Sequence, residues 1–131
     1  MEDYEKAEQE FEKEIAIKVL NDEKMDYDIF KDLAIKTYEK YLKNHEEAIN
    51  YFNDYRCNLF MDGEIEDYDD EDGWRDRVNY IDTDDPNICI AVSVHMRVWD
   101  CEFFDEEDSD RVYFYAVKKV PYTAYRYERI Y

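Results

Sequence analysis

A chain of 131 residues can bury the core of one domain, and with 45% hydrophobic residues it is too apolar to be intrinsically disordered, although 40% of its residues are charged. Thirty-six acidic residues against 17 Lys and Arg give a net charge of −19. This charge excludes direct binding to nucleic acid or to an anionic membrane and favours a cationic partner. General acidity without a specific use is the alternative interpretation.

The cysteines and the hydrophobic runs indicate the compartment. Cys57, Cys89 and Cys101 are odd in number and form no closely spaced pair, which is typical of buried thiols in a reducing compartment. No apolar run approaches ~18 residues, and the N-terminus lacks the basic start and apolar stretch of a secretion signal. We therefore expect a cytoplasmic protein with no membrane partner.

Hydrophobic periodicity predicts three helices in the first half of the chain. In residues 3–20 and 27–43, and again after Asn44, apolar side chains recur at spacings of three and four. Asp26 and Asn44 stand where N-caps of the second and third helices belong, and Gly63 follows the third helix where a C-terminal glycine is typical. Because the connections are short, we expect each helix to pack antiparallel to the next.

The second half of the chain changes character. Residues 64–87 form an acidic connector, predicted as a short helix or an ordered loop that Trp74 anchors to the body. Alternating apolar and polar or small side chains then predict a half-buried strand over 88–98, followed by strands over 111–120 and 122–131. The acidic run between the first two of these strands is expected to form a hairpin loop.

These elements define the predicted architecture. Three helices followed by three strands favour the α+β class, with three N-terminal helices packed on a C-terminal three-stranded antiparallel sheet. We expect a single domain over residues 1–131, made of a helical part (3–63), the acidic connector (64–87) and an antiparallel β part (88–131).

The residue types of an active site are present, but not at a catalytic spacing. The only candidate nucleophile and base are Cys89 or Cys101 with His95, which share one face of a predicted strand. Six residues along an extended strand separate each cysteine from the histidine by ~20 Å, so buried thiols and an ordinary strand histidine explain them better. Phosphate-binding glycine loops and hydrolase motifs are absent from the sequence. We therefore predict no catalytic residues, no cofactor and a protein that is not an enzyme.

One acidic stretch suggests a calcium loop at first sight. With Gly73 at the turn position of an EF-hand, the first ligand would be Tyr68 and the last would be Asn79, so the pattern fails. Paired Cys or His ligands for zinc are also lacking. The sequence predicts no dedicated metal site.

Tyrosine is unusually frequent, with 14 residues in the chain. Several lie among arginines near the C-terminus, where they could stack on nucleic-acid bases, but the surrounding acids would repel a phosphate backbone. Packing in the core and on the sheet is the better interpretation, and exposed tyrosines beside carboxylates would anchor a protein interface.

Two acidic runs are the main functional signal, because they flank the most strand-like segment of the chain. Fixed carboxylates can occupy a groove that grips phosphates, although one helix ridge, spaced at ~5–6 Å, falls short of the ~1.7 Å charge spacing of duplex DNA. The acidic loops would therefore have to join a ridge formed by Glu5, Glu8 and Glu12. The predicted partner-binding residues are phosphate surrogates and one aromatic anchor: Asp67, Asp69, Asp70, Glu71, Asp72, Trp74, Asp84, Asp85, Asp105, Glu106, Glu107, Asp108 and Asp110.

In size, acidity, aromatic content and the runs at 67–72 and 105–110, the chain resembles phage-encoded anti-restriction and anti-CRISPR inhibitors that imitate DNA. The resemblance covers the character of the whole chain. It implies a non-enzymatic protein that binds the basic nucleic-acid groove of a defence nuclease or CRISPR effector in the host cytoplasm. A second hypothesis is an immunity or antitoxin protein that docks on a cognate toxin, from which excess duplex DNA would not displace it.

Overall fold

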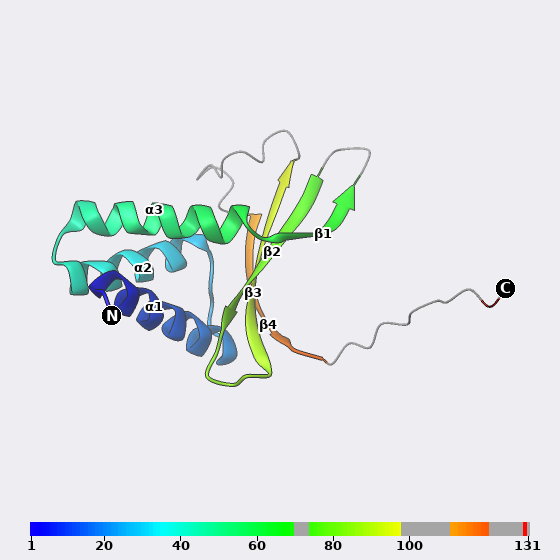
Figure 1. Ribbon diagram of the computed structural model, residues 1–131, viewed down its shortest axis with the longest axis horizontal. Helices are drawn as coiled ribbons and strands as arrows, with labels where there is room; N and C mark the ends of the chain where they lie inside the picture. Colours follow the sequence, from blue (N-terminus) through cyan, green and yellow to red (C-terminus); the bar gives the residue numbers. More distant parts are fainter. Residues whose placement is uncertain (70–73, 98–110, 121–129, 131) are drawn as a thin grey trace.

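The computed structural model describes residues 1–69, 74–97, 111–120 and 130, and for residues 64–69, 74, 75, 96 and 97 it describes the backbone alone. The first half of the chain forms three helices, α1 (Asp3–Leu20), α2 (Tyr27–Leu42) and α3 (His45–Met61). Successive helices run in opposite directions and pack against one another (Figure 1). The three predicted helices and their antiparallel packing are therefore confirmed.

The N-caps of α2 and α3 are the residues that the sequence indicates. The Asp26 carboxylate accepts a hydrogen bond from the backbone N–H of Ile29 at 2.9 Å, and the Asn44 side chain accepts one from the N–H of Glu47 at 3.1 Å. Each cap satisfies a backbone donor that the first turn of a helix leaves unpaired. The second helix ends one residue earlier than predicted, because Lys43 adopts the left-handed conformation with φ of 56°.

Gly63 follows α3 for a reason of packing. The helix ends at Met61, and Asp62 is its C-cap. A Cβ atom on residue 63 would lie 3.0 Å from the backbone carbonyl carbon and oxygen of Val78. The close approach of a neighbouring strand, rather than a left-handed turn, therefore requires glycine at this position.

Four antiparallel strands follow the helices in the spatial order β1-β2-β3-β4. They are β1 (Glu64–Asp69), β2 (Trp74–Asp82), β3 (Ile88–Arg97) and β4 (Val112–Lys118). The last two confirm the strands predicted at 88–98 and 111–120, and with the helices they confirm the α+β class (Figure 1). Apart from residue 130, the strand predicted at 122–131 lies outside the described residues, as does the hairpin loop predicted at 105–110.

The prediction of a short helix or ordered loop over residues 64–87 is wrong, because β1 and β2 lie within this segment. The sequence of β2 does not alternate between apolar and polar residues as a half-buried strand does, because two of the side chains that face the helices are polar. Arg77 Nη1 donates to the carbonyl of Met61 at 2.7 Å, and Asn79 Nδ2 donates to the carbonyl of Leu59 at 3.1 Å. These carbonyls belong to the last turn of α3, which leaves them without a partner inside the helix. The strand therefore satisfies the helix end with polar groups, and its sequence does not show a strand pattern.

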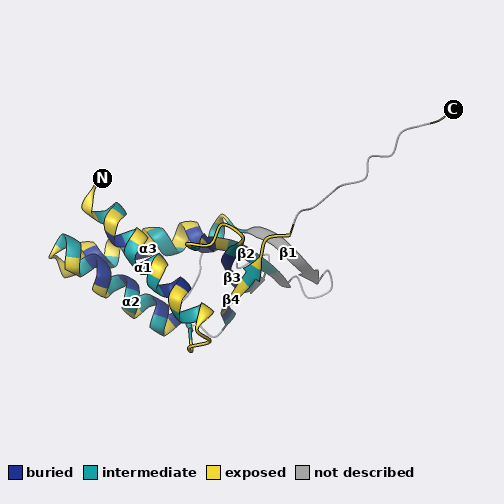
Figure 2. Cartoon of the chain, turned by 90° about the horizontal axis from the view of Figure 1, so that it is seen from below, coloured by how far each residue is buried: buried dark blue, intermediate teal, exposed yellow. Residues whose placement is uncertain are grey.

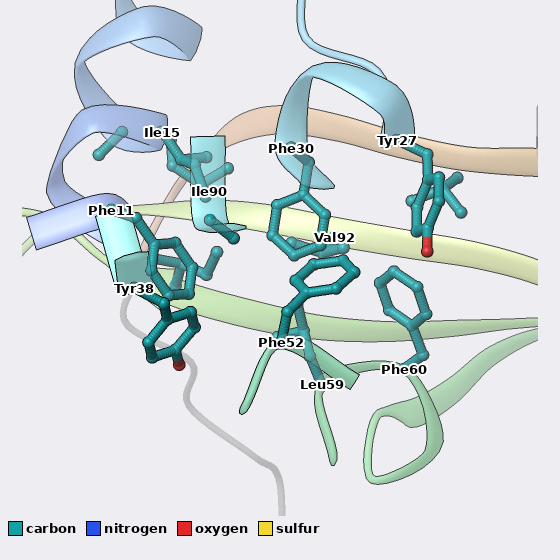
Figure 3. Close-up of a cluster of buried hydrophobic side chains, with 14 of the residues drawn as sticks. Phe11, Ile15, Tyr27, Phe30, Tyr38, Phe52, Leu59, Phe60, Ile90 and Val92 are labelled. Carbon is teal, nitrogen blue, oxygen red and sulfur yellow. The ribbon is translucent and has the colours of Figure 1, made fainter. Parts of the chain in front are cut away.

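The core lies between the helices and one face of the sheet, where buried residues of both layers meet (Figure 2). Phe30 of α2 is fully buried, and its ring centroid is 5.5 Å from that of Phe52 and 5.2 Å from that of Phe114 in β4. Ile90 and Val92 of β3 complete this layer (Figure 3). Because each such side chain contributes ~1.5–3 kcal/mol when fully buried, the aromatic layer holds the helices on the sheet.

β3 is buried on both faces, whereas the sequence predicts a half-buried strand. On its outer face Ala91 lies between Tyr80 of β2 and Tyr115 of β4 in the strand register. Ala91 is 0% exposed, while the two tyrosines are 44% and 43% exposed. The large cross-strand side chains therefore shield the small one from water, which the sequence of β3 alone does not indicate.

Candidate functional site

The turn between β2 and β3 holds the two predicted partner-binding residues whose side chains the structure describes. Asp84 and Asp85 are both exposed. The turn is held by the Thr83 hydroxyl, which accepts a hydrogen bond from the N–H of Asp85 at 3.2 Å, and by Asp85 Oδ1, which accepts one from the N–H of Asn87 at 2.9 Å. Asp84 Oδ2 lies 3.8 Å from Lys13 Nζ of α1. The two carboxylates therefore extend from a structured turn beside the first helix.

The other predicted partner-binding residues are placed by backbone only or not at all. Asp67 and Asp69 belong to β1, and Trp74 is the first residue of β2, opposite Asp69 in the register. Trp74 therefore begins a strand, which corrects the predicted loop. The remaining predicted carboxylates lie outside the described residues: Asp70, Glu71, Asp72, Asp105, Glu106, Glu107, Asp108 and Asp110.

A groove of about 560 Å³ lies among α1, α2, α3 and β2, and the sequence analysis did not predict it. We name it the tyrosine groove. Among the described residues that line it, none is Lys, Arg or His. The residues that give it its character are five tyrosines and four carboxylates: Tyr4, Tyr38, Tyr51, Tyr55, Tyr80, Glu8, Glu12, Asp54 and Asp62.

Three tyrosine rings stack along this groove. The ring centroid of Tyr51 is 5.1 Å from that of Tyr4, with 10° between the planes, and 5.8 Å from that of Tyr38, with 22° between the planes. The three rings come from three different helices, so the stack joins α1, α2 and α3. Beside it, the Tyr55 hydroxyl donates to Glu12 Oε1 at 3.1 Å. Aromatic faces and a carboxylate thus border the same space.

Glu12 is the carboxyl group of the groove with the most perturbed titration. Burial raises its pKa from 4.5 to about 7, although the hydrogen bond from Tyr55 acts in the opposite direction. The charges of Glu8 and Asp82 raise the pKa of Glu12 further. Burial, and then the charge of Glu5, also raises the pKa of Glu8. Glu12 is therefore partly desolvated and lies near other acids, so it loses a share of its charge to protonation near neutral pH.

A second hollow of about 510 Å³ adjoins the tyrosine groove, because Glu12 lines both. It lies between α1 and the turn joining β2 to β3, and Lys13 is the one basic residue among its described lining. We name the seven carboxylates that line the two hollows the acidic band: Glu8, Glu12, Asp54, Asp62, Asp82, Asp84 and Asp85. Carboxylates of α1 and of the β2–β3 turn thus line adjoining hollows, although Glu5 is outside this lining.

Helical spacing carries the signal for the groove that sequence reasoning missed. Glu8 and Glu12 are four residues apart on α1, and Tyr51 and Tyr55 are four residues apart on α3. Residues at this spacing are neighbours on one helix face. No feature of the sequence indicates that the two faces oppose each other, which depends on how the helices pack.

His95 and Cys89 each pair with a different aspartate of β2. His95 Nδ1 is 2.5 Å from Asp76 Oδ1, and Cys89 Sγ is 3.6 Å from Asp82 Oδ1. Each pair is directly opposite in the β2–β3 register. The histidine therefore has an orienting carboxylate, but Cys89 lies six residues away along β3 beside its own aspartate. Cys101, the other candidate nucleophile, lies outside the described residues.

Within the part of the chain that the structure describes, no group of three or more His, Cys, Asp or Glu is arranged to hold a metal ion. None of the described helices combines the length and the apolar composition needed to cross a bilayer.

No protein-family model matches this chain, and neither a curated protein nor a solved structure matches it.

Proposed function

We propose that the protein is a non-enzymatic inhibitor that binds the basic nucleic-acid-binding groove of a defence nuclease or CRISPR effector, in the manner of a DNA mimic. The acidic band supports this proposal, because its seven carboxylates lie on one packed core, on α1, on α3 and its C-cap, at the end of β2 and in the β2–β3 turn. A net charge of −19 adds long-range attraction to a cationic partner and repels nucleic acid itself.

The spacing of the carboxylates shows why the band matters more than any one helix. Glu8 and Glu12 are four residues apart on α1, which places their Cβ atoms ~5–6 Å apart. Duplex DNA carries one charge per ~1.7 Å of axis, so one helix ridge supplies roughly a third of that density. Asp54 and Asp62 across the groove, and Asp82 beyond Glu12, bring further carboxylates alongside α1. The band therefore approaches the charge density of a duplex more closely than α1 alone.

The tyrosine groove favours a second candidate function. Tyrosine side chains are enriched where protein interfaces are anchored, and Tyr4 and Tyr51 of the groove are partly exposed. An immunity or antitoxin protein would use such a mixed aromatic and acidic surface to dock beside the active site of a toxin. The two candidates differ in one respect: excess duplex DNA displaces a mimic, whereas a protein docked away from the nucleic-acid groove stays bound.

Two charge-matched variants test the proposal, because both lose three negative charges. The band variant replaces three carboxylates of the acidic band: Glu8→Gln, Asp54→Asn and Asp84→Asn. The control variant replaces three exposed carboxylates outside the band: Glu23→Gln, Asp32→Asn and Glu46→Gln.

The full chain serves as bait in lysates of cells that carry restriction and CRISPR systems, and the retained nucleases are assayed for cleavage. We expect the wild type and the control variant to inhibit cleavage, and the band variant to inhibit at least about tenfold less. Inhibition should be relieved by excess duplex DNA and should weaken steeply above ~0.5 M salt. Equal inhibition by both variants, or a complex that persists in 1 M salt, would contradict the proposal. A target that stays bound in excess duplex would favour the immunity-type function.

A further inference from the structure

The tyrosine groove has a more specific chemistry than negative charge alone. A cation over an aromatic face is attracted by the quadrupole of the ring, and a carboxylate adds charge-assisted hydrogen bonds. The groove offers both, because Tyr4, the partly exposed end ring of the Tyr4–Tyr51–Tyr38 stack, lines it together with Glu8. A site that combines the two kinds of group favours an organic cation.

The carboxylates of the groove face other acids rather than bases. Among the described residues, the ion pairs of α1 lie outside the groove: Glu10 Oε1 is 2.8 Å from Lys40 Nζ, and Lys13 pairs with Asp84. Within the groove, Glu12 accepts a hydrogen bond from the neutral hydroxyl of Tyr55. Burial raises the pKa of Glu12, and the charges of Glu8 and Asp82 raise it further. A bound cation would remove this unfavourable interaction.

The chemistry of the lining also discriminates among ligands. Phosphate and other anions would be repelled, and an uncharged ligand would leave partly buried carboxylates unpaired. An ammonium group satisfies the charge, but a guanidinium is planar, stacks on aromatic rings, is weakly hydrated and presents five donors in a fixed geometry. A volume of about 560 Å³ is within the range of ligand pockets, so the groove can admit a side chain together with its neighbours in a short segment.

We propose that the tyrosine groove binds an arginine side chain presented by a basic segment of the partner protein. The guanidinium would stack on the Tyr4 ring and donate to carboxylates on both walls, Glu8 of α1 and Asp54 of α3. This inference rests on the proposed function for the basic character of the partner, and it adds the contact that anchors the complex.

Three short peptides test the ligand class directly. The full chain, labelled with ¹⁵N, is titrated with blocked tetrapeptides of sequence Gly-Arg-Arg-Gly, Gly-Lys-Lys-Gly and Gly-citrulline-citrulline-Gly. We expect the arginine peptide to shift the amide signals of residues around the groove and the lysine peptide to bind about tenfold more weakly. The citrulline peptide has the same shape without the charge and should not bind at the same concentrations. Equal binding of the arginine and citrulline peptides would overturn the proposal.

Matched variants locate the site. Asp54→Asn should weaken binding of the arginine peptide by about tenfold, whereas Glu46→Gln, on the same helix outside the groove, should leave it unchanged. Tyr4→Leu should weaken it similarly, and Tyr113→Leu on the exposed face of β4 should not. Asp54 is exposed, so its substitution decides the question even if Tyr4→Leu unfolds the chain.

Failure of this inference can be told apart from failure of the proposed function. If the arginine peptide binds in a manner that depends on Asp54 but no captured nuclease is inhibited, the arginine site is supported and the proposed inhibitor function is refuted. If nuclease inhibition is salt-sensitive but Asp54→Asn does not change peptide binding, the inhibitor function is supported and the arginine site is refuted.

Discussion

Replacing Glu12 with glutamine should stabilise the protein above neutral pH. Burial, assisted by the charges of Glu8 and Asp82, raises the pKa of Glu12 from 4.5 to about 7 in the folded state. Between these two pH values the folded protein retains a proton that the unfolded chain releases. The unfolded state therefore binds fewer protons, and the free energy of unfolding falls as pH rises from about 4.5 through 7. Glutamine keeps an oxygen that can accept the Tyr55 hydroxyl hydrogen bond, but it carries no charge.

The size of the effect follows from the pKa of Glu12. A fully shielded group with this perturbation would lose roughly 3 kcal/mol above pH 7. Because Glu12 keeps part of its surface in water, we expect Glu12→Gln to gain ~1–2 kcal/mol at pH 8.5 and almost nothing at pH 4. The same variant should bind the arginine peptide more weakly, since the groove loses a carboxylate.

Urea denaturation of the wild type and of Glu12→Gln at pH 4, 6 and 8.5 measures this effect. Glu46→Gln, at an exposed position on α3, controls for the loss of one negative charge. A stability difference between Glu12→Gln and the wild type that is the same at pH 4 and at pH 8.5 would refute the reasoning. So would a variant less stable than the wild type at pH 8.5.

Three further substitutions test the packing and the helix ends. Phe30→Ala should lower the free energy of unfolding by ~3–5 kcal/mol, because Phe30 is fully buried, whereas Tyr113→Ala, at a side chain 54% exposed, should change it by less than ~1 kcal/mol in thermal denaturation. Asn44→Ala should lower it by ~1 kcal/mol through loss of the N-cap hydrogen bond, and an equal effect of Asn50→Ala, in the exposed middle of α3, would contradict that role. Gly63→Ala should lower it by ~1–3 kcal/mol, since the new Cβ would lie 3.0 Å from the backbone of β2, and an unchanged denaturation midpoint would show that the strand yields.

The helices could be predicted from the sequence because the forces that define them act over a few residues. The caps at Asp26 and Asn44 bond to residues three positions further on, within the first turn of their own helices. The apolar stripes repeat within each helix at its own period. β3 was equally visible, because its side chains alternate, although its burial on both faces depends on tyrosines of two other strands.

β2 could not be predicted, because two of its side chains are polar and form hydrogen bonds with a helix that is distant in the sequence. Arg77 and Asn79 bond to carbonyls at the end of α3, 16 and 20 residues earlier in the chain. In the sequence they read as polar residues of a loop. The same holds for the candidate site: Asp84 and Asp85 were found from their charge, but the tyrosine groove was not, since its walls come from separate helices.

The sequence by itself determined three helices, the α+β class and a strongly acidic protein, because periodicity, capping and charge are carried by near neighbours in the chain. Only the tertiary structure decided which carboxylates form the acidic band and that tyrosine side chains lie beside them. Tyr55 meets Glu12 across 43 residues of chain, and the turn at Asp84 reaches the same helix from the sheet. Such long-range contacts depend on how the helices pack against each other and against the sheet. The sequence of one helix does not specify which face of another helix it will oppose.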